Sequence, residues 1–333
     1  MLEKIIGRYL PGMEELIVQP IGSGLIHRTW KVGAPEGGAY ILQEMNTAVF
    51  TDPDAIAHNM ELVGRPLMKT VDGEVYCREN AVVFRMFPFV AGSRTYDVVS
   101  RPEQAFEAAR QFGLFTRNLG GLEVGKLKVT LPGFHDLPLR YEQFERAVAE
   151  GDAMRVRESG ALIGFLESQR ELVDRYLGLK RDPGFALRVT HHDTKISNVL
   201  FDASGRGLCV IDLDTVMPGY FISDVGDMIR TYVSPASEEE VHLSAIGVRR
   251  EFYRAIYDGY MGVMGDGLSA VEREHFGYSG LFLTYMQALR FLTDHLNRDI
   301  YYGARYDGHN YNRAANQAEL LRRLLEFQVS PIS

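Results

Sequence analysis

The sequence has little cysteine, no long apolar run and no excess of positive charge. Its 333 residues contain only two cysteines, Cys77 and Cys209, which are too few for the disulfide framework of a small secreted domain. The formal net charge is −8 at pH 7. This charge argues against a nucleic acid or a membrane surface as partner, because phosphate backbones and anionic lipids recruit basic patches.

The sequence also shows no apolar segment long enough for a signal peptide or for membrane insertion. Residues 1–12 include an early acidic Glu3 and lack the apolar core of a signal peptide. The most apolar later stretch, residues 276–289, is too short to span a bilayer. We therefore expect a soluble cytoplasmic protein, and the sequence gives no indication of its oligomeric state.

The chain changes character near residue 90. Residues 16–43 alternate β-prone runs with glycine turns, which predicts three antiparallel strands, and residues 75–90 predict two more. Helical periodicity follows in several segments, and one helix lies among the strands. The predicted helices cover residues 53–67, 102–119, 161–177, 238–261, 270–297 and 312–327. The expected fold is α+β with two lobes, residues 1–90 and 91–333.

One stretch, residues 189–214, combines a polar loop with a predicted β-hairpin. Asp193 follows two histidines, and Asn198 comes five residues later. Two apolar β-branched runs enclose a turn-rich segment, and Asp212 ends the second run. Because a hairpin returns to its start, we expect Asp193, Asn198 and Asp212 around one point. One carboxylate beside two metal ligands suits phosphoryl transfer, which depends on positioning and charge neutralisation.

This stretch resembles the catalytic and metal loops of the protein-kinase-like fold in its aminoglycoside phosphotransferase branch. Within that branch, five segments resemble N-acetylhexosamine 1-kinases, and the similarity runs from about residue 21 to residue 320. The five segments read RVTHHDTKISNVLFD, VIDLDTVMPG, DVGDMIR, YILQEMNTAVF and LRFLTDHLNRDIYY.

The resemblance implies roles for the residues of the loop. Asp193 would orient the attacking hydroxyl or accept its proton, and Lys195 would lie near the γ-phosphate of ATP. Asn198 and Asp212 would hold Mg²⁺. His191 would brace the loop from behind, and Asp224 would bond its backbone. His192 is expected to be exposed and dispensable, and Asp214 either adds a second carboxylate near the metal or caps the turn.

On the nucleotide side, the sequence departs from the kinase pattern. The third strand carries Gln43 where kinases have a lysine for the nucleotide phosphates, so we interpret the charge as relocated to Lys195. Glu61, at the position of the acidic partner of that lysine, is either a hydrogen-bond partner of Gln43 or a solvated residue. The remaining nucleotide contacts are expected from a small-residue turn and from a hinge between the lobes: Gly22, Ser23, Gly24, Phe87 and Phe89.

The acceptor side is expected in the second lobe. The resemblance gives Arg290 and Tyr301 acceptor-binding roles, although a buried ion pair of Arg290 with an aspartate is equally compatible with the sequence. Leu25 and Thr231 occupy positions where N-acetylhexosamine kinases carry His and Phe. The loop at residues 133–138 either borders the acceptor pocket through His135 and Asp136 or is a turn stabilised by the aspartate.

The function implied is that of a kinase transferring the γ-phosphate of ATP to the anomeric hydroxyl of an N-acetylhexosamine, GlcNAc or GalNAc. The short interval between Asp212 and Asp224 leaves no room for a long activation loop and favours a small-molecule acceptor. A kinase of the same fold for another sugar, an amino alcohol or an aminoglycoside is the first alternative. The second is a nucleotide-binding module without catalysis, which Gln43 suggests and the intact Asp193, Asn198 and Asp212 oppose.

Overall fold

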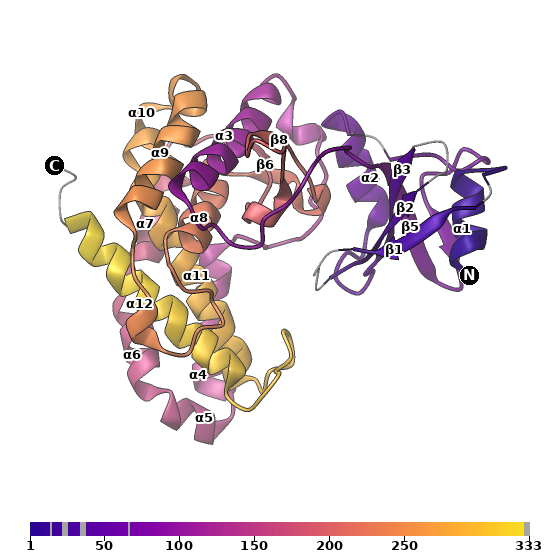
Figure 1. Cartoon of the computed structure of the whole chain (residues 1–333). Helices are drawn as coiled ribbons and strands as arrows, with labels where there is room; N and C mark the ends of the chain where they lie inside the picture. The colour runs from indigo at the N-terminus through magenta and orange to yellow at the C-terminus, as the bar shows by residue number, and fades with distance from the viewer. Residues whose placement is uncertain (14, 22–25, 34–37, 66, 330–333) are drawn as a thin grey trace. The chain divides into compact units, whose positions relative to one another are not determined.

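The computed structural model of the chain describes all residues except 14, 22–25, 34–37, 66 and 330–333. The chain forms two compact units, each built from segments that are separate in sequence (Figure 1). The first unit comprises Met1–Arg94, Leu122–Pro132 and Asp212–Pro218, and the second comprises Thr95–Gly121, Gly133–Ile211 and Gly219–Ser333.

The first unit contains a five-stranded antiparallel sheet of order β1-β2-β3-β5-β4. Its strands are β1 (Ile17–Pro20), β2 (Arg28–Gly33), β3 (Ala39–Met45), β4 (Cys77–Glu79) and β5 (Val82–Pro88). Two α-helices accompany the sheet, α1 (Leu2–Tyr9) and α2 (Pro53–Leu62). The predicted fold class is confirmed for this part of the chain, although the sequence did not predict α1.

The two faces of this sheet differ in chemistry. Alternate side chains of a strand point to opposite faces, and one set packs on α1 in a hydrophobic core. That core contains Ile5, Ile6, Tyr9, Leu10, Val32, Leu42, Cys77, Phe84 and Met86. The opposite face carries a polar row across three strands, because Thr29 pairs in register with Gln43 and Gln43 with Arg85. The sheet thus anchors polar groups on the face away from its core.

The second unit is mainly helical. Its α-helices are α3 (Pro102–Asn118), α4 (Leu137–Glu150), α5 (Ala153–Glu158), α6 (Gly160–Ser168), α7 (Glu171–Leu179), α8 (Phe221–Tyr232), α9 (Arg250–Met264), α10 (Ala270–Glu274), α11 (Phe276–Leu296) and α12 (His309–Val329). Helix α11 is the centre of this unit, since it packs against α4, α8 and α12. Helix α3 packs against α9.

Two glycines allow α8 and α11 to approach each other closely. A Cβ on Gly226 would meet the backbone oxygen of Ser279, and a Cβ on Gly280 would meet the side chain of Ile229. A larger residue at either position would push α8 away from α11. This packing fixes α8, which carries Asp224 and Asp227, two aspartates that bond the backbone of the loop at residues 191–194.

The predicted hairpin is present in the second unit. Strands β7 (Val199–Phe201) and β8 (Gly207–Val210) pair antiparallel, with Val199 opposite Val210. The hydrogen bond from Ile211 N to Asn198 O, at 2.9 Å, extends the pairing by one step. The shorter remaining elements are β6 (Arg188–Thr190), β9 (Met217–Gly219), η1 (Val124–Lys126), η2 (Ile196–Asn198), η3 (Leu213–Thr215), η4 (Leu243–Ala245) and η5 (Gly265–Gly267).

Some predicted boundaries were wrong because local terminators were overlooked. Helix α2 ends at Leu62, since Gly64 takes a left-handed conformation with φ +73°. The strands predicted within residues 75–90 end at Pro88, the last residue of β5. Two predicted helices are each divided in two, into α6 and α7 and into α10 and α11.

The predicted helix start at residue 238 was also wrong. Helix α9 begins only at Arg250. Residues 238 and 239 lie in a loop, where Glu238 binds Arg230 and Arg313, and Glu239 binds His309. These ion pairs hold the loop around residues 238 and 239 in an irregular conformation. The helical periodicity of the sequence therefore predicted a helix there wrongly.

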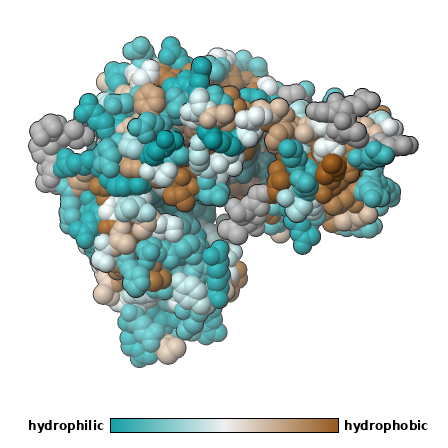
Figure 2. Space-filling view, in the orientation of Figure 1, coloured by the Kyte–Doolittle hydropathy of each residue, from teal (hydrophilic) through white to brown (hydrophobic). Residues whose placement is uncertain are grey.

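Hydrophilic residues predominate on the visible face around α4, α5 and α6 (Figure 2). Among the helices of the described chain, none combines the length and apolar character needed to cross a membrane.

Candidate active site

The loop after β6 brings three of the predicted site residues together. The Nδ2 of Asn198 donates to Asp193 Oδ2 at 3.1 Å and to the Asp193 backbone oxygen at 2.9 Å. Lys195 Nζ lies 3.1 Å from Asp193 Oδ1. The charge of Asp193 raises the pKa of Lys195, so the lysine is protonated at neutral pH. The loop therefore presents a carboxylate and a cation side by side.

His191 braces this loop from within the protein. Its Nε2 donates to the backbone oxygen of Ile211 at 2.9 Å, and its Nδ1 accepts from the backbone N–H of Asp193 at 3.4 Å. The ring also packs edge-on against Phe112 and Phe115. His191 thus joins the start of the loop to Ile211 at the end of the hairpin, and Ile211 directly precedes Asp212 in the chain.

Helix α8 fastens the backbone of the same loop. Asp224 accepts from the backbone N–H of His191 at 3.0 Å and of His192 at 2.7 Å. Asp227 accepts from the backbone N–H of Thr194 at 2.8 Å, and the Tyr232 hydroxyl donates to the Thr194 oxygen. Burial raises the pKa of Asp224 to about 6. A helix held by close packing therefore sets the loop geometry.

His192 corrects one expectation. Its side chain is buried rather than exposed, with only 5% of the residue accessible. Its Nδ1 donates to the Thr190 oxygen at 3.1 Å, and its backbone is left-handed with φ +68°. The ring lies where a Cβ on Gly219 would have to be. His192 is part of the packed support of the loop, so its replacement is not expected to be neutral.

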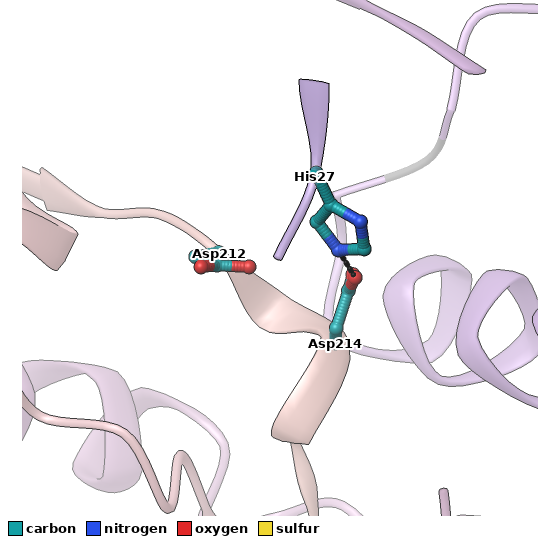
Figure 3. A group of neighbouring side chains, drawn as sticks. All are labelled: His27, Asp212 and Asp214. Atoms are coloured by element: carbon teal, nitrogen blue, oxygen red, sulfur yellow. Dashed lines mark hydrogen bonds and ion pairs between the residues drawn. The ribbon is translucent and has the colours of Figure 1, made fainter. Parts of the chain in front are cut away.

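In the first unit, a turn carries two carboxylates beside a histidine (Figure 3). One ligand atom from each of His27, Asp212 and Asp214 lies within 4.8 Å of the other two. Asp214 and His27 point toward each other, with His27 Nε2 2.7 Å from Asp214 Oδ2. Asp212 is exposed, with a left-handed backbone at φ +61°.

The hydrogen bonds of this cluster decide which of its atoms suit a cation. His27 Nδ1 accepts from the Asn46 backbone N–H at 3.1 Å, so the ring proton is on Nε2 and neither nitrogen offers a lone pair. Arg85 donates to both oxygens of Asp214, at 2.5 and 2.8 Å. The accessible carboxylate of Asp212 remains the suitable donor. A carboxylate oxygen is a ligand that Mg²⁺ prefers.

Gln43 does not pair with Glu61, which is exposed. Both polar atoms of the Gln43 amide form hydrogen bonds: Nε2 donates to Thr29 Oγ1 at 3.2 Å, and Oε1 accepts from Arg85 Nε at 3.0 Å. The solvated alternative for Glu61 is therefore correct.

The two expected hinge phenylalanines lie near cations, with Arg85 5.0 Å from the ring of Phe87 and Lys31 4.1 Å from the ring of Phe89.

Among the expected acceptor residues, Arg290 has aromatic and amide neighbours. Its guanidinium lies 5.4 Å from the ring of Phe134 and 5.5 Å from the ring of Tyr302, and it donates to Gln287 at 3.2 Å. It forms no ion pair with any described residue, so the buried ion-pair alternative is wrong within that part of the chain. Tyr301 packs edge-on against Tyr302 and is 69% exposed.

Of the other two expected acceptor residues, the structure describes only Thr231. Thr231 uses its hydroxyl to donate to the Asp227 backbone oxygen one helical turn earlier, at 2.6 Å. Leu25 lies outside the described residues, as do Gly22, Ser23 and Gly24.

A chain of ring contacts links Arg290 to the catalytic loop inside the second unit. Phe134 stacks on His135 at 4.5 Å, and His135 lies 5.2 Å from the ring of His192, the neighbour of Asp193. Burial, together with the charges of His192 and Arg290, lowers the pKa of His135 well below its ordinary value. The loop at residues 133–138 therefore borders Arg290 and also Arg140, which together we call the arginine cluster. Asp136 caps α4, where its carboxylate accepts from Leu139 N.

Arg140 is a second arginine in this cluster. It donates to the Gly133 oxygen at 2.7 Å and to Gln143 at 2.9 Å, and it forms no ion pair with a described residue. Burial and then the charge of Arg290 lower the pKa of Arg140. Both arginines contact Phe134, because Arg140 donates to the Phe134 backbone oxygen at 3.5 Å and Arg290 lies over the Phe134 ring.

Sequence reasoning missed four residues of these networks: His27, Arg85, Arg140 and Asp227. Only Asp227 had a visible signal, since the Asp-Val-Gly-Asp spacing places both aspartates on one face of a helix. The others are brought into place by strand register or by tertiary packing.

Comparison with known protein families assigns the chain to one of them. Residues 17–260 match the phosphotransferase enzyme family. The chain belongs to this family. The matched residues include the loop with Asp193, the hairpin and the turn with Asp212. Membership of the family makes the protein a phosphotransferase.

Several solved structures share the fold at low sequence identity. A microcompartment-associated aminopropanol kinase has a TM-score of 0.68 at 16% identity, with 100% of this chain and 99% of that chain covered. Choline kinase from Cryptosporidium parvum has a TM-score of 0.60 at 15% identity, covering 100% and 98%. Spectinomycin phosphotransferase, solved with ADP and spectinomycin, has a TM-score of 0.58 at 11% identity, covering 97% of each chain.

The positions of Lys195 and Gln43 predict an asymmetry between two alanine variants. We expect Lys195→Ala to lower kcat by about 10²–10³-fold, the usual loss when a group that stabilises developing charge is removed. Gln43→Ala should lower it much less, because the amide contacts Thr29 and Arg85 and does not act where charge develops in the transition state. Steady-state kinetics with saturating ATP would measure both. Small, equal losses would contradict the relocation of charge to Lys195.

Proposed function

We propose that this phosphotransferase transfers the γ-phosphate of ATP, with Mg²⁺, to the anomeric hydroxyl of an N-acetylhexosamine, GlcNAc or GalNAc. The observation that carries the acceptor class is that Arg140 and Arg290 both contact Phe134. The next residue, His135, packs on His192 beside Asp193, and neither arginine forms an ion pair with a described residue.

Asp193 acts on the acceptor hydroxyl. Its two oxygens are oriented by Asn198 and Lys195, so the carboxylate has a fixed direction before substrate binds. A carboxylate so placed orients the hydroxyl and takes its proton as the new P–O bond forms. Lys195 offsets the negative charge that accumulates on the transferring group.

Asn198 and Asp212 would hold the metal ion. When bound, Mg²⁺ supplies positive charge to the phosphate oxygens and orients them. The protein contributes an amide oxygen whose orientation is set by the bond from Asn198 Nδ2 to Asp193, and an exposed carboxylate on a turn with defined contacts.

The arginine cluster favours an oxygen-rich acceptor over an amine. Arginine offers five donors and no acceptor, which suits hydroxyl and carbonyl oxygens. Choline and aminopropanol, after which two of the structural neighbours are named, are cationic at neutral pH, and two nearby guanidinium groups would repel them. A neutral N-acetylated sugar avoids this repulsion and places its oxygens within reach of the donors.

The epimer and acyl group of the sugar depend on two departures from the N-acetylhexosamine kinases. Leu25 and Thr231 replace larger polar or aromatic residues of those enzymes, His and Phe. Smaller or more apolar side chains at these positions would enlarge or dry part of the pocket. The preferred epimer or N-acyl group is therefore expected to differ from the usual one of that group.

A screen of free acceptors for ATP-dependent ADP release tests this function. The panel contains GlcNAc, GalNAc, their unacetylated parent hexoses, choline and aminopropanol, each with wild type and with Asp193→Asn as the inactive control. We expect the highest kcat/KM for an N-acetylhexosamine and no turnover of the two amines. Turnover restricted to amines would contradict the proposal.

A further inference from the structure

A buried ion pair connects the sheet of the first unit to the turn that carries Asp212. Arg85, from β5, and Asp214, from η3, are each 1% exposed. Nη1 and Nη2 of the arginine donate to the two oxygens of the carboxylate at 2.5 and 2.8 Å. Two parallel hydrogen bonds fix both the position and the rotation of the carboxylate, which a lysine could not do.

Both members of the pair are held by further partners. Arg85 Nε donates to Gln43 Oε1 at 3.0 Å, and Gln43 is its cross-strand neighbour on β3. On the other side, His27 Nε2 donates to Asp214 Oδ2 at 2.7 Å (Figure 3). The guanidinium therefore has no freedom to rotate, and three donors converge on one carboxylate.

The turn itself requires such support. Asp212 has a left-handed backbone with φ +61° and ψ +63°, a conformation that is uncommon for residues other than glycine. Two residues later, Asp214 is held by Arg85. Beyond it, the Val216 backbone oxygen accepts from Asn59 of α2 at 2.9 Å. The turn is thus fixed at two points, on the sheet and on α2, and Asp212 projects from its start.

Arg85 also separates the roles of the two carboxylates. Asp212 and Asp214 each have an oxygen in a cluster whose atoms lie within 4.8 Å of one another, and like charges so close disfavour each other. Arg85 neutralises the buried Asp214, whereas the carboxylate of Asp212 is on an exposed residue. A lysine in place of Gln43 would put a second cation beside Arg85 and remove the oxygen that accepts from its Nε. The absence of a lysine on β3 and the presence of Arg85 on β5 are therefore linked.

We propose that Arg85 is a positioning residue, which holds Asp214 so that the turn presents the Asp212 carboxylate, already oriented, to the divalent cation that accompanies the nucleotide. This inference rests on the metal-binding role of Asp212 in the proposed function. It does not depend on which alcohol is phosphorylated.

The test is calorimetric titration of Mg²⁺ into the full-length protein saturated with ADP, together with thermal unfolding. The variant Arg85→Met/Asp214→Asn removes both charges while keeping an oxygen for His27. We expect it to fold and to bind Mg²⁺ at least about 10-fold more weakly, as is usual when a partner of a metal ligand is lost. Arg78→Met, which replaces a half-exposed arginine of β4, is the matched control and should bind as wild type.

Thermal unfolding separates positioning from stability. A role limited to stability would lower the melting temperature of the double variant and leave its affinity for Mg²⁺ within about twofold of wild type, and that result would overturn the proposal. If the double variant does not fold, Arg85→Lys decides, because it keeps the charge and loses the paired hydrogen bonds. A several-fold loss of Mg²⁺ affinity in Arg85→Lys supports the positioning role, and an unchanged affinity refutes it. No acceptor is present, so the outcome is independent of the proposed sugar.

Discussion

Asp193→Asn is expected to lower kcat by about 10²–10⁴-fold, the usual contribution of a positioned general acid or base. The amide has the same shape and can still accept from Asn198, but it cannot take a proton from the acceptor and no longer pairs with Lys195. Steady-state kinetics would measure the loss. The fold and the affinity for ADP should stay as in wild type, which thermal unfolding and calorimetry would check. Near-normal turnover by a pure sample would remove Asp193 from the mechanism.

Asp212→Ala should abolish the dependence of nucleotide binding on Mg²⁺. The substitution removes the exposed carboxylate of the turn and leaves the buried pair of Arg85 and Asp214 intact, so the turn is expected to remain folded. Losing a direct ligand costs at least as much as losing one of its partners, which is about 10–100-fold in metal affinity.

Calorimetry of ADP with and without Mg²⁺ would measure this effect. Asp72→Ala replaces an exposed aspartate of the same unit and should behave as wild type. If Asp212→Ala bound ADP with an unchanged response to Mg²⁺, the metal assignment would be wrong.

The catalytic loop was predictable because its chemistry is local in sequence. Asp193, Lys195 and Asn198 lie within six residues of one another, and the hairpin after them has a strong turn signal. Hydrogen bonds and an ion pair that connect these three side chains follow from this short spacing. The antiparallel sheet of the first unit was predictable for a similar reason, since its strands alternate with glycine turns.

The support of the site depends on contacts between residues that are far apart in sequence. Gln43 and Arg85 meet through the register of β3 and β5, and Arg85 meets Asp214 across 129 positions. The sequence shows that Gln43 stands where kinases have a lysine, but it does not show that Arg85 lies beside Gln43 on the neighbouring strand. Lys195 was therefore the only replacement cation that could be inferred.

Buried polar residues were hardest to place. His192 was expected at the surface because a histidine beside a catalytic aspartate has no local sign of burial. Its left-handed backbone turns the ring inward, into space that is open because residue 219 is glycine. Arg140 was missed because its position relative to Arg290 depends on the packing of α4 against α11. Such contacts are decided by tertiary structure, which periodicity does not encode.

Phosphorus NMR of the reaction product tests the central claim most directly. Wild-type protein, ATP, Mg²⁺ and an N-acetylhexosamine are predicted to give a signal from a sugar 1-phosphate, coupled to the anomeric proton, that grows as ATP is consumed. A sugar 6-phosphate, or a phosphorylated product only when an amino alcohol replaces the sugar, would contradict the account.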